Sequence, residues 1–151
     1  MSLRLFIQEF YRIIWEEKDS DAIEKLLIEQ APLRGLEELY MAGQRDFVAF
    51  HRMVHAQLDE LKVELTQIVE QDEWVACRLR IRARDRASGR PIDATAHTMA
   101  RIVDGQVAEG YNLVDFMSIF QQMGRLPERV LDHCLLGGQL EFQRPGRRLL
   151  N

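Results

Sequence analysis

The sequence predicts one α+β domain in which a curved antiparallel sheet covers a set of helices. Three helical segments come first, and four long strand-like runs follow between Leu61 and Asp115. The dipeptide Asp104-Gly105 joins the last two runs and favours a two-residue hairpin turn, which needs positive φ angles. Because strands of this length normally twist and coil, we expect a concave sheet face that forms one side of a pocket.

The N-terminal helices are indicated by apolar residues at three- and four-residue steps. Tyr11 and Trp15 stand beside the apolar stripe of the first helix, and Asp19 and Asp21 supply capping side chains for the second. The helices are expected over residues 3–17, 23–28 and 46–58. The apolar face of the third helix consists of Phe47, Phe50, His51, Val54 and Leu58. The segment 31–44 has no clean period and is predicted to be a loop with at most one short element.

The strands are marked by alternation of apolar and polar residues. They are expected over residues 61–71, 74–85, 91–103 and 106–114. In the second strand Val75, Cys77 and Leu79 point one way, while arginines at 78, 80, 82 and 84 point the other way. One sheet face should therefore be buried and the other exposed to water. The buried face of the third strand is expected to consist of Ala94, Ala96, Thr98, Ala100 and Ile102.

After the last strand, a short helix is expected over residues 115–123, ending at Gly124 and Pro127. Residues 1–127 are therefore predicted to form the single domain. Residues 128–151 are predicted to be a C-terminal extension, partly helical and then a loose basic tail.

Length and composition indicate an ordinary globular chain. Its 151 residues suit one hydrophobic core. The formal net charge of -4 supplies no overall attraction for nucleic acid or an anionic membrane, so neither is expected as a partner. No apolar stretch approaches the roughly 18 residues of a membrane helix, and early charges argue against a signal peptide, so a cytoplasmic location is expected. The two cysteines have no spacing typical of a metal site or a disulfide framework.

Four short motifs are spread over the chain from Leu3 to Pro127. They are Phe10-Tyr11 with Trp15, the helix over 47–58, the hairpin over 101–105 and the closing run over 115–124. Together they resemble the SnoaL-like polyketide cyclases of the nuclear transport factor 2-like superfamily. The resemblance implies a cone-shaped α+β barrel, with a curved antiparallel sheet wrapped around three N-terminal helices and a hydrophobic cavity. It also implies a homodimer through the sheet.

The reaction that the resemblance implies is an intramolecular aldol ring closure on a polyketide ester, without a metal or a cofactor. Such a reaction needs a base that takes a proton from the carbon next to a carbonyl. Catalytic members resemble one another in an acidic residue on the last strand and a polar residue on the strand before it. Alignment through Asp104-Gly105 places Asn112 and Thr98 at these positions. Neither can act as a base, although the Asn112 amide could still hold a carbonyl.

His51 is the titratable side chain that the helix pattern directs toward the cavity, and its ordinary pKa near neutrality suits a base. A single histidine on an apolar helix face is more often a hydrogen-bonded packing residue, so both roles stay open. The resemblance implies that Tyr11 and Trp15 line the pocket, whereas aromatics at this spacing can also be core residues. The other expected ligand-binding residues are Phe47, Phe50, Cys77, Leu79 and Thr98.

Two functions follow as hypotheses. The chain is either an enzyme that acts on a small hydrophobic carbonyl compound through His51, with Asn112 and Tyr11 orienting it, or a noncatalytic module for ligand binding or dimerisation. If His51 is catalytic, its ring should reach the same cavity as the Asn112 amide.

The arginine row on the outer sheet face is expected to form ion pairs across the strands with Glu64, Glu70, Asp93 and Glu109. It is therefore interpreted as a solvated or dimer-facing surface, on which His97, Met99 and Arg101 could meet a twofold partner. His55, His97 and His133 have no metal-ligand spacing.

Overall fold

The fold is described from a computed structural model, which covers residues 2–37 and 41–142. The basic tail expected after residue 142 lies outside the described residues. No helix in the described ranges is long and apolar enough to cross a membrane.

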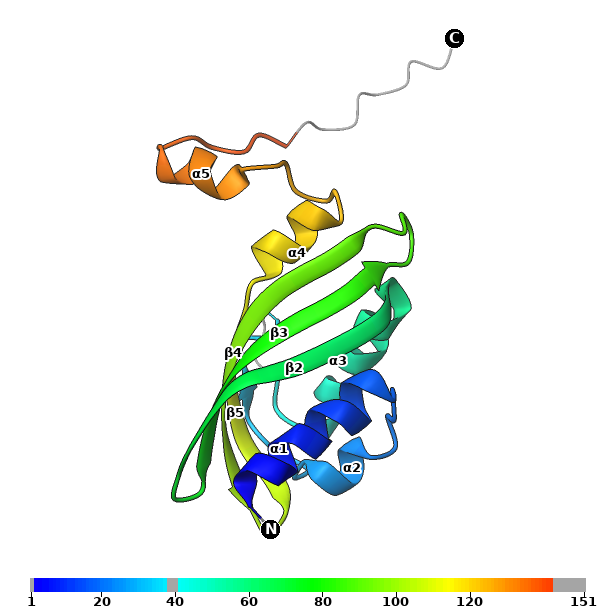
Figure 1. The fold of residues 1–151 in the computed structure, drawn as a ribbon, viewed down its shortest axis with the longest axis vertical. Coiled ribbons are helices and arrows are strands. Elements are labelled where there is room, and N and C mark those ends of the chain that lie inside the picture. Colours follow the sequence, from blue (N-terminus) through cyan, green and yellow to red (C-terminus); the bar gives the residue numbers. More distant parts are fainter. Residues whose placement is uncertain (1, 38–40, 143–151) are drawn as a thin grey trace.

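Three helical segments precede the long strands, as the sequence predicts (Figure 1). Helix α1, Leu3–Tyr11, begins where the Ser2 hydroxyl accepts a hydrogen bond from the Leu5 amide at 3.1 Å. It continues as a π-helical turn, η1, Arg12–Glu16, where the sequence predicts ordinary helix to residue 17. The Asp19 carboxylate accepts hydrogen bonds from the Asp21 and Ala22 amides just before the short helix α2, Ile23–Leu26, and α3 spans Gln44–Gln57.

The sheet has five strands in the order β1-β5-β4-β3-β2, and it is curved but not closed. The four long strands pair antiparallel, and the two-residue strand β1 pairs parallel with β5. Strand β1 is the short element within the segment predicted as a loop. The strands are β1 Leu33–Arg34, β2 Leu58–Gln71, β3 Trp74–Asp85, β4 Pro91–Val103 and β5 Gln106–Val114.

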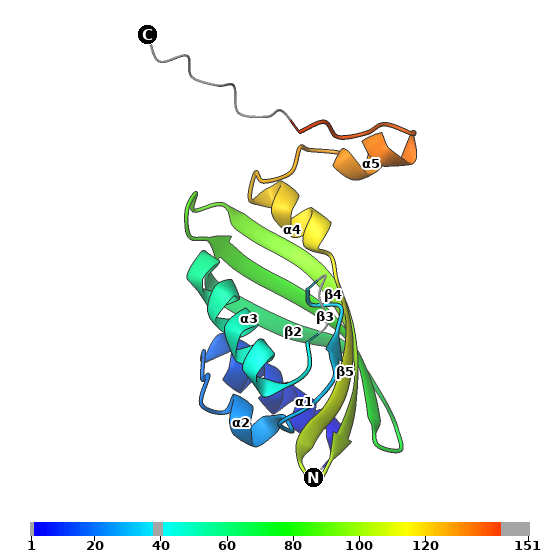
Figure 2. The ribbon, with the colours of Figure 1, turned by 180° about the vertical axis from the view of Figure 1, so that it is seen from behind.

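The helices α1, α2 and α3 lie in the concave side of the sheet, as both views show (Figures 1 and 2). The inward rows of β3 and β4 are mostly buried, and they include Val75, Cys77 and Leu79 and the run Ala94 to Ile102 at alternate positions. The α+β prediction with a curved sheet around three helices is therefore confirmed. Because each helix buries one apolar stripe against this face, helices and sheet share one main core.

The outer face of the sheet carries the arginine row and its cross-strand ion pairs. Arg80 binds both carboxylate oxygens of Asp93, at 3.0 and 2.6 Å, and Arg101 binds Glu109 at 2.9 Å. Arg82 lies 3.7 Å from Glu64. The prediction for Glu70 is wrong, because its carboxylate instead accepts a hydrogen bond from the backbone amide of Arg4 at the start of α1.

Two short helices follow the sheet. Asp115 accepts a hydrogen bond from the Ser118 amide at 3.0 Å and so caps α4, Phe116–Gln122, which lies against β4 (Figure 2). Helix α5, Val130–Leu135, comes next and projects beyond α4 in both views.

Candidate functional site

A cavity of about 590 Å³ lies between the concave face of the sheet and the helices. This volume is in the range of sites that bind small organic molecules. Its walls come from α1, η1, α3, α4 and the inward rows of the sheet. The aromatic side chains of the lining are Phe10, Tyr11, Trp15, Phe47, Phe50, Phe116 and Phe120.

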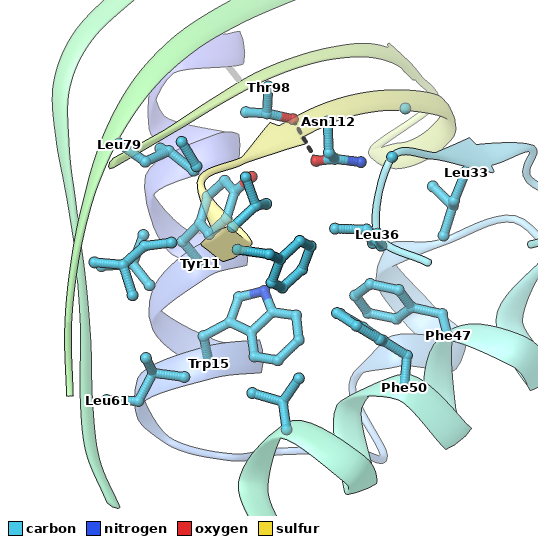
Figure 3. A pocket seen from close by; sticks show the side chains of 18 of the residues that line it. Tyr11, Trp15, Leu33, Leu36, Phe47, Phe50, Leu61, Leu79, Thr98 and Asn112 are labelled. Carbon is cyan, nitrogen blue, oxygen red and sulfur yellow. Dashed lines mark hydrogen bonds between the residues drawn. The ribbon is translucent and has the colours of Figure 1, made fainter. Parts of the chain in front are cut away.

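Two polar side chains of the cavity, Thr98 and Asn112, lie at the end formed by β4 and β5 (Figure 3). Thr98 and Asn112 are direct partners across these two strands, and the Thr98 hydroxyl donates to Asn112 Oδ1 at 2.9 Å. The Asn112 Nδ2 donates to the backbone carbonyl of Arg34 in β1 at 3.0 Å. Because a backbone carbonyl can only accept, the amide nitrogen must face Arg34, and the orientation of the carboxamide is fixed.

Tyr11 stands beside this polar pair at the end of α1. Burial raises the pKa of its phenol well above the ordinary value, and the nearby Cys77 thiol raises it further, while a side-chain hydrogen bond with Thr98 acts in the opposite direction. The phenol is therefore neutral at physiological pH. Since the Thr98 proton is used by Asn112, the Tyr11 O–H is the donor in its hydrogen bond with Thr98, and it can turn from the Thr98 oxygen toward a ligand.

Glycine at position 35 allows β1 to approach β5 closely enough for the Asn112 contact. Gly35 has φ +84°, and a Cβ atom there would lie 1.7 Å from the backbone oxygen of Asn112. Any other residue would push β1 away, because the positive φ and the close approach both exclude a side chain. The polar end of the cavity therefore depends on Gly35 as well as on the side chains that face the cavity.

The opposite part of the cavity is aromatic. Trp15 projects from η1 toward α3, where its ring centroid lies 5.8 Å from that of Phe47 and 5.9 Å from that of Phe50 (Figure 3). Both pairs are close to perpendicular, the edge-to-face arrangement that aromatic rings prefer. A flat apolar ligand could contact these ring faces and edges without an unfavourable charge nearby.

His51 does not reach this cavity, contrary to what the catalytic hypothesis requires. Its side chain is 3% exposed, and its Nε2 lies 2.6 Å from the backbone carbonyl of Ile14 in η1. It is not among the described residues that line the cavity, whereas Trp15, whose tilted ring lies 5.2 Å from it between centroids, is one of them. The geometry is that of a packing histidine that caps a carbonyl of the π-helical turn.

Of the other site residues proposed from the sequence, all but one line the cavity. Tyr11, Trp15, Phe47, Phe50, Leu79, Thr98 and Asn112 all line the cavity, although their role in binding stays a prediction. Cys77 is buried and is not among the described lining residues, and burial raises its pKa to about 11, which keeps it a thiol.

Sequence reasoning missed two parts of the site. The segment at Gly35 to Glu37 forms one wall, and Glu37 brings a carboxylate to the lining. Helix α4 contributes Phe116, Ile119, Phe120 and Met123. Of these, Gly35 carried a signal, since an isolated glycine in an irregular segment can mark a close backbone approach.

Comparison with known proteins gives one family. The model of the family described as SnoaL-like polyketide cyclase matches residues 6–123. A search of curated proteins finds no match.

Several solved structures share the fold. TsrD from Streptomyces laurentii superposes with a TM-score of 0.70 and 19% identity, over 82% of this chain and 96% of that one. IdmH from Streptomyces antibioticus, a candidate polyketide cyclase, gives 0.69 and 19%, over 80% and 97%. AclR from Streptomyces galilaeus, a candidate hydroxylase, gives 0.72 and 19%, over 88% and 89%. At this identity the likeness establishes the fold alone.

Proposed function

Since this chain belongs to the SnoaL-like polyketide cyclase family, we propose that it binds a small, neutral, hydrophobic ligand in the cavity and holds an oxygen of that ligand at Tyr11 and Asn112. The proposal does not include proton abstraction by the residue at position 112. The observation that carries it is the Asn112 carboxamide, which donates to Arg34 and accepts from Thr98.

The hydrogen-bonding groups left over at the polar end indicate the ligand chemistry. One Asn112 N–H goes to Arg34, so the second N–H is available, and the Tyr11 O–H can turn from Thr98 toward a ligand. Both are neutral donors. They fit a ligand acceptor such as a ketone or ester oxygen, and an anionic ligand would lose its hydration without gaining a counter-charge from these two groups.

Paired ligands of one shape test this proposal. We expect benzophenone to bind about 3- to 10-fold more tightly than diphenylmethane, because one net hydrogen bond contributes roughly 0.5–1.5 kcal/mol. Calorimetry, or quenching of Trp15 fluorescence, measures both affinities. In the double variant Asn112→Leu with Tyr11→Phe, which lacks both donors, the two ligands should bind equally. If neither compound binds the wild-type protein, or if the ketone has no advantage over the hydrocarbon, the proposal is wrong.

Glu37 supports a second candidate function, acid–base chemistry on the same ligand. It is a carboxylate among the described lining residues, and a carboxylate can take a proton from the carbon next to a carbonyl. Deuterium exchange into 2-tetralone, followed by NMR, tests this. Exchange above the buffer rate that is lost in Glu37→Gln supports an enzyme, whereas exchange lost instead in His51→Ala would return the role to His51.

For assembly we propose a homodimer that uses the outer face of the sheet. Large apolar side chains on this face are exposed, among them Val69, Met99, Tyr111 and Leu113. Exposed apolar groups of this size on one face are typical of a protein contact. Light scattering should give twice the mass of one chain, and a single-chain mass at micromolar concentration would contradict the proposal.

A further inference from the structure

The C-terminal helix α5 is the part of the described chain that the family does not explain. The family match ends at residue 123, before α5 begins. In α5 itself only Val130 is buried. The large apolar side chains of α5 and the residues that follow are exposed: Leu131 50%, Leu135 74%, Leu136 89%, Leu140 40% and Phe142 92%.

An uncovered helix of this kind needs a partner. A six-residue helix is marginal in water without tertiary contacts. The five side chains together expose on the order of 500 Å² of apolar surface, the size at which a patch on a single chain marks an interaction site. We infer that α5 of each copy packs against the outer sheet face of a second copy, so that the two contacts are related by a twofold axis.

The outer face offers a matching apolar row. The cross-strand partners Val69, Ala76, Met99 and Tyr111 form a line across β2, β3, β4 and β5, with Leu113 next to its end. At the usual strand spacing this row is about 14 Å long, and a helix of six residues is about 9 Å long. The helix and the residues after it can therefore lie along the row.

Charges around the two surfaces are complementary. Glu128 and Glu141 flank the apolar residues of α5 and form no ion pair with another described residue. On the outer face, Arg78 sits beside the row and its guanidinium likewise pairs with no described carboxylate. A second copy thus supplies an apolar surface and, in Arg78, a cation for one of these two glutamates. An anionic bilayer offers an apolar interior but repels these two glutamates.

Helix α5 does not cover the row of its own chain, where Met99 and Leu113 are exposed. Helix α4 starts where the Asp115 amide donates to the carbonyl of Thr95 at 3.1 Å, four residues along β4 from Met99. Helix α5 then lies beyond α4, away from the sheet, in both views (Figures 1 and 2). Two symmetric contacts would cover on the order of 1,000 Å² per copy, above the roughly 800 Å² per partner of stable interfaces.

The native cysteine of α5 provides a direct test by cross-linking. Cys134 is exposed, whereas Cys77 is buried and its pKa is raised to about 11, so it does not compete. In Leu113→Cys, oxidation with copper phenanthroline should give most of the protein as a covalent dimer through positions 113 and 134. The double variant with Cys134→Ser should lose this product. A dimer that persists in the double variant, joined through the two 113 positions, would mean that the sheets pack face to face and that the inference is wrong. Equal cross-linking of the wild-type protein, through Cys134 alone, would also overturn it.

Solution mass gives an independent test. Leu135→Glu with Leu136→Glu should change the mass from twice 17.7 kDa to 17.7 kDa, because both side chains are exposed in the single chain and the variant still folds. The control Leu5→Glu, at a 57% exposed position of α1, should stay dimeric. A wild-type protein that is monomeric and sediments with phosphatidylglycerol vesicles would instead assign α5 to a membrane surface and refute the dimer contact.

Discussion

Replacement of Asn112 by aspartate tests whether the carboxamide is required by the structure around it. In Asn112→Asp, a carboxylate oxygen would face the Arg34 carbonyl across the 3.0 Å that the amide N–H now bridges. The variant loses a hydrogen bond and leaves two acceptors opposed at a partly buried position. We expect it to be destabilised by about 1–3 kcal/mol at neutral pH, which for a domain of this size lowers Tm by roughly 2–12 °C.

The pH dependence of this loss follows from the same contact. Opposed acceptors and an apolar cavity favour the protonated carboxyl, so the folded-state pKa of the new aspartate should lie above its unfolded value of about 3.9. A raised folded pKa means that the destabilisation is small below the unfolded pKa and grows as pH rises through the folded pKa. The difference from wild type should therefore be larger at pH 7.5 than at pH 4.

Urea denaturation of wild type and variant at the two pH values measures the effect. Gln67→Glu on the outer face of β2 is the matched control, since it makes the same change from amide to carboxyl at an exposed position. It should stay within about 0.5 kcal/mol of wild type. If Asn112→Asp is as stable as wild type at both pH values, the carboxamide does not hold β1 in place and the reasoning fails.

Three further perturbations check other parts of the site. Thr98→Val removes the donor to Asn112 Oδ1 and should weaken benzophenone binding about 3- to 10-fold by calorimetry; an unchanged affinity would show that Thr98 does not orient the amide. Gly35→Ala should destabilise by more than about 1 kcal/mol in urea, because alanine at φ +84° would also meet the Asn112 backbone oxygen; the control Gly89→Ala has positive φ and open space, so it should cost less. Burial lowers the pKa of the His55 ring to about 4, and the neighbouring His51 and the cations Lys18 and Arg86 act in the same direction. The free energy of unfolding should therefore be highest above pH 6.5 and fall as pH drops toward 4. His55→Gln should flatten this part of a Tm-against-pH curve, and an unchanged slope would mean that other groups cause the acid sensitivity.

The long strands could be predicted from sequence because their signals are local. The predicted bounds of β3, β4 and β5 agree with the structure, since alternation fixes the faces and Asp104-Gly105 fixes the last hairpin. Helix α3 begins two residues earlier than predicted, at Gln44. In these elements the residues next to a position in the sequence are enough to predict whether its side chain is buried or exposed.

The site was harder to predict because its contacts join distant segments. Strand β1 has two residues, and its pairing of Leu33 with Gly110 leaves no periodic pattern in the sequence. Periodicity placed His51 on the buried face of α3, but it could not show that η1 presents the Ile14 carbonyl there. A helical period identifies a face, whereas the partner of a side chain depends on the tertiary packing.

The carboxamide at position 112 and the wall made by β1 are parts of one arrangement. Gly35 lets β1 approach β5, and this approach leaves the Arg34 carbonyl where it needs a donor. An amide supplies that donor and a carboxylate does not. The amide at this position therefore goes together with a fixed cavity wall. A carboxylate placed at position 112 alone would face Arg34 rather than a ligand, so proton abstraction by that carboxylate would also require β1 to move.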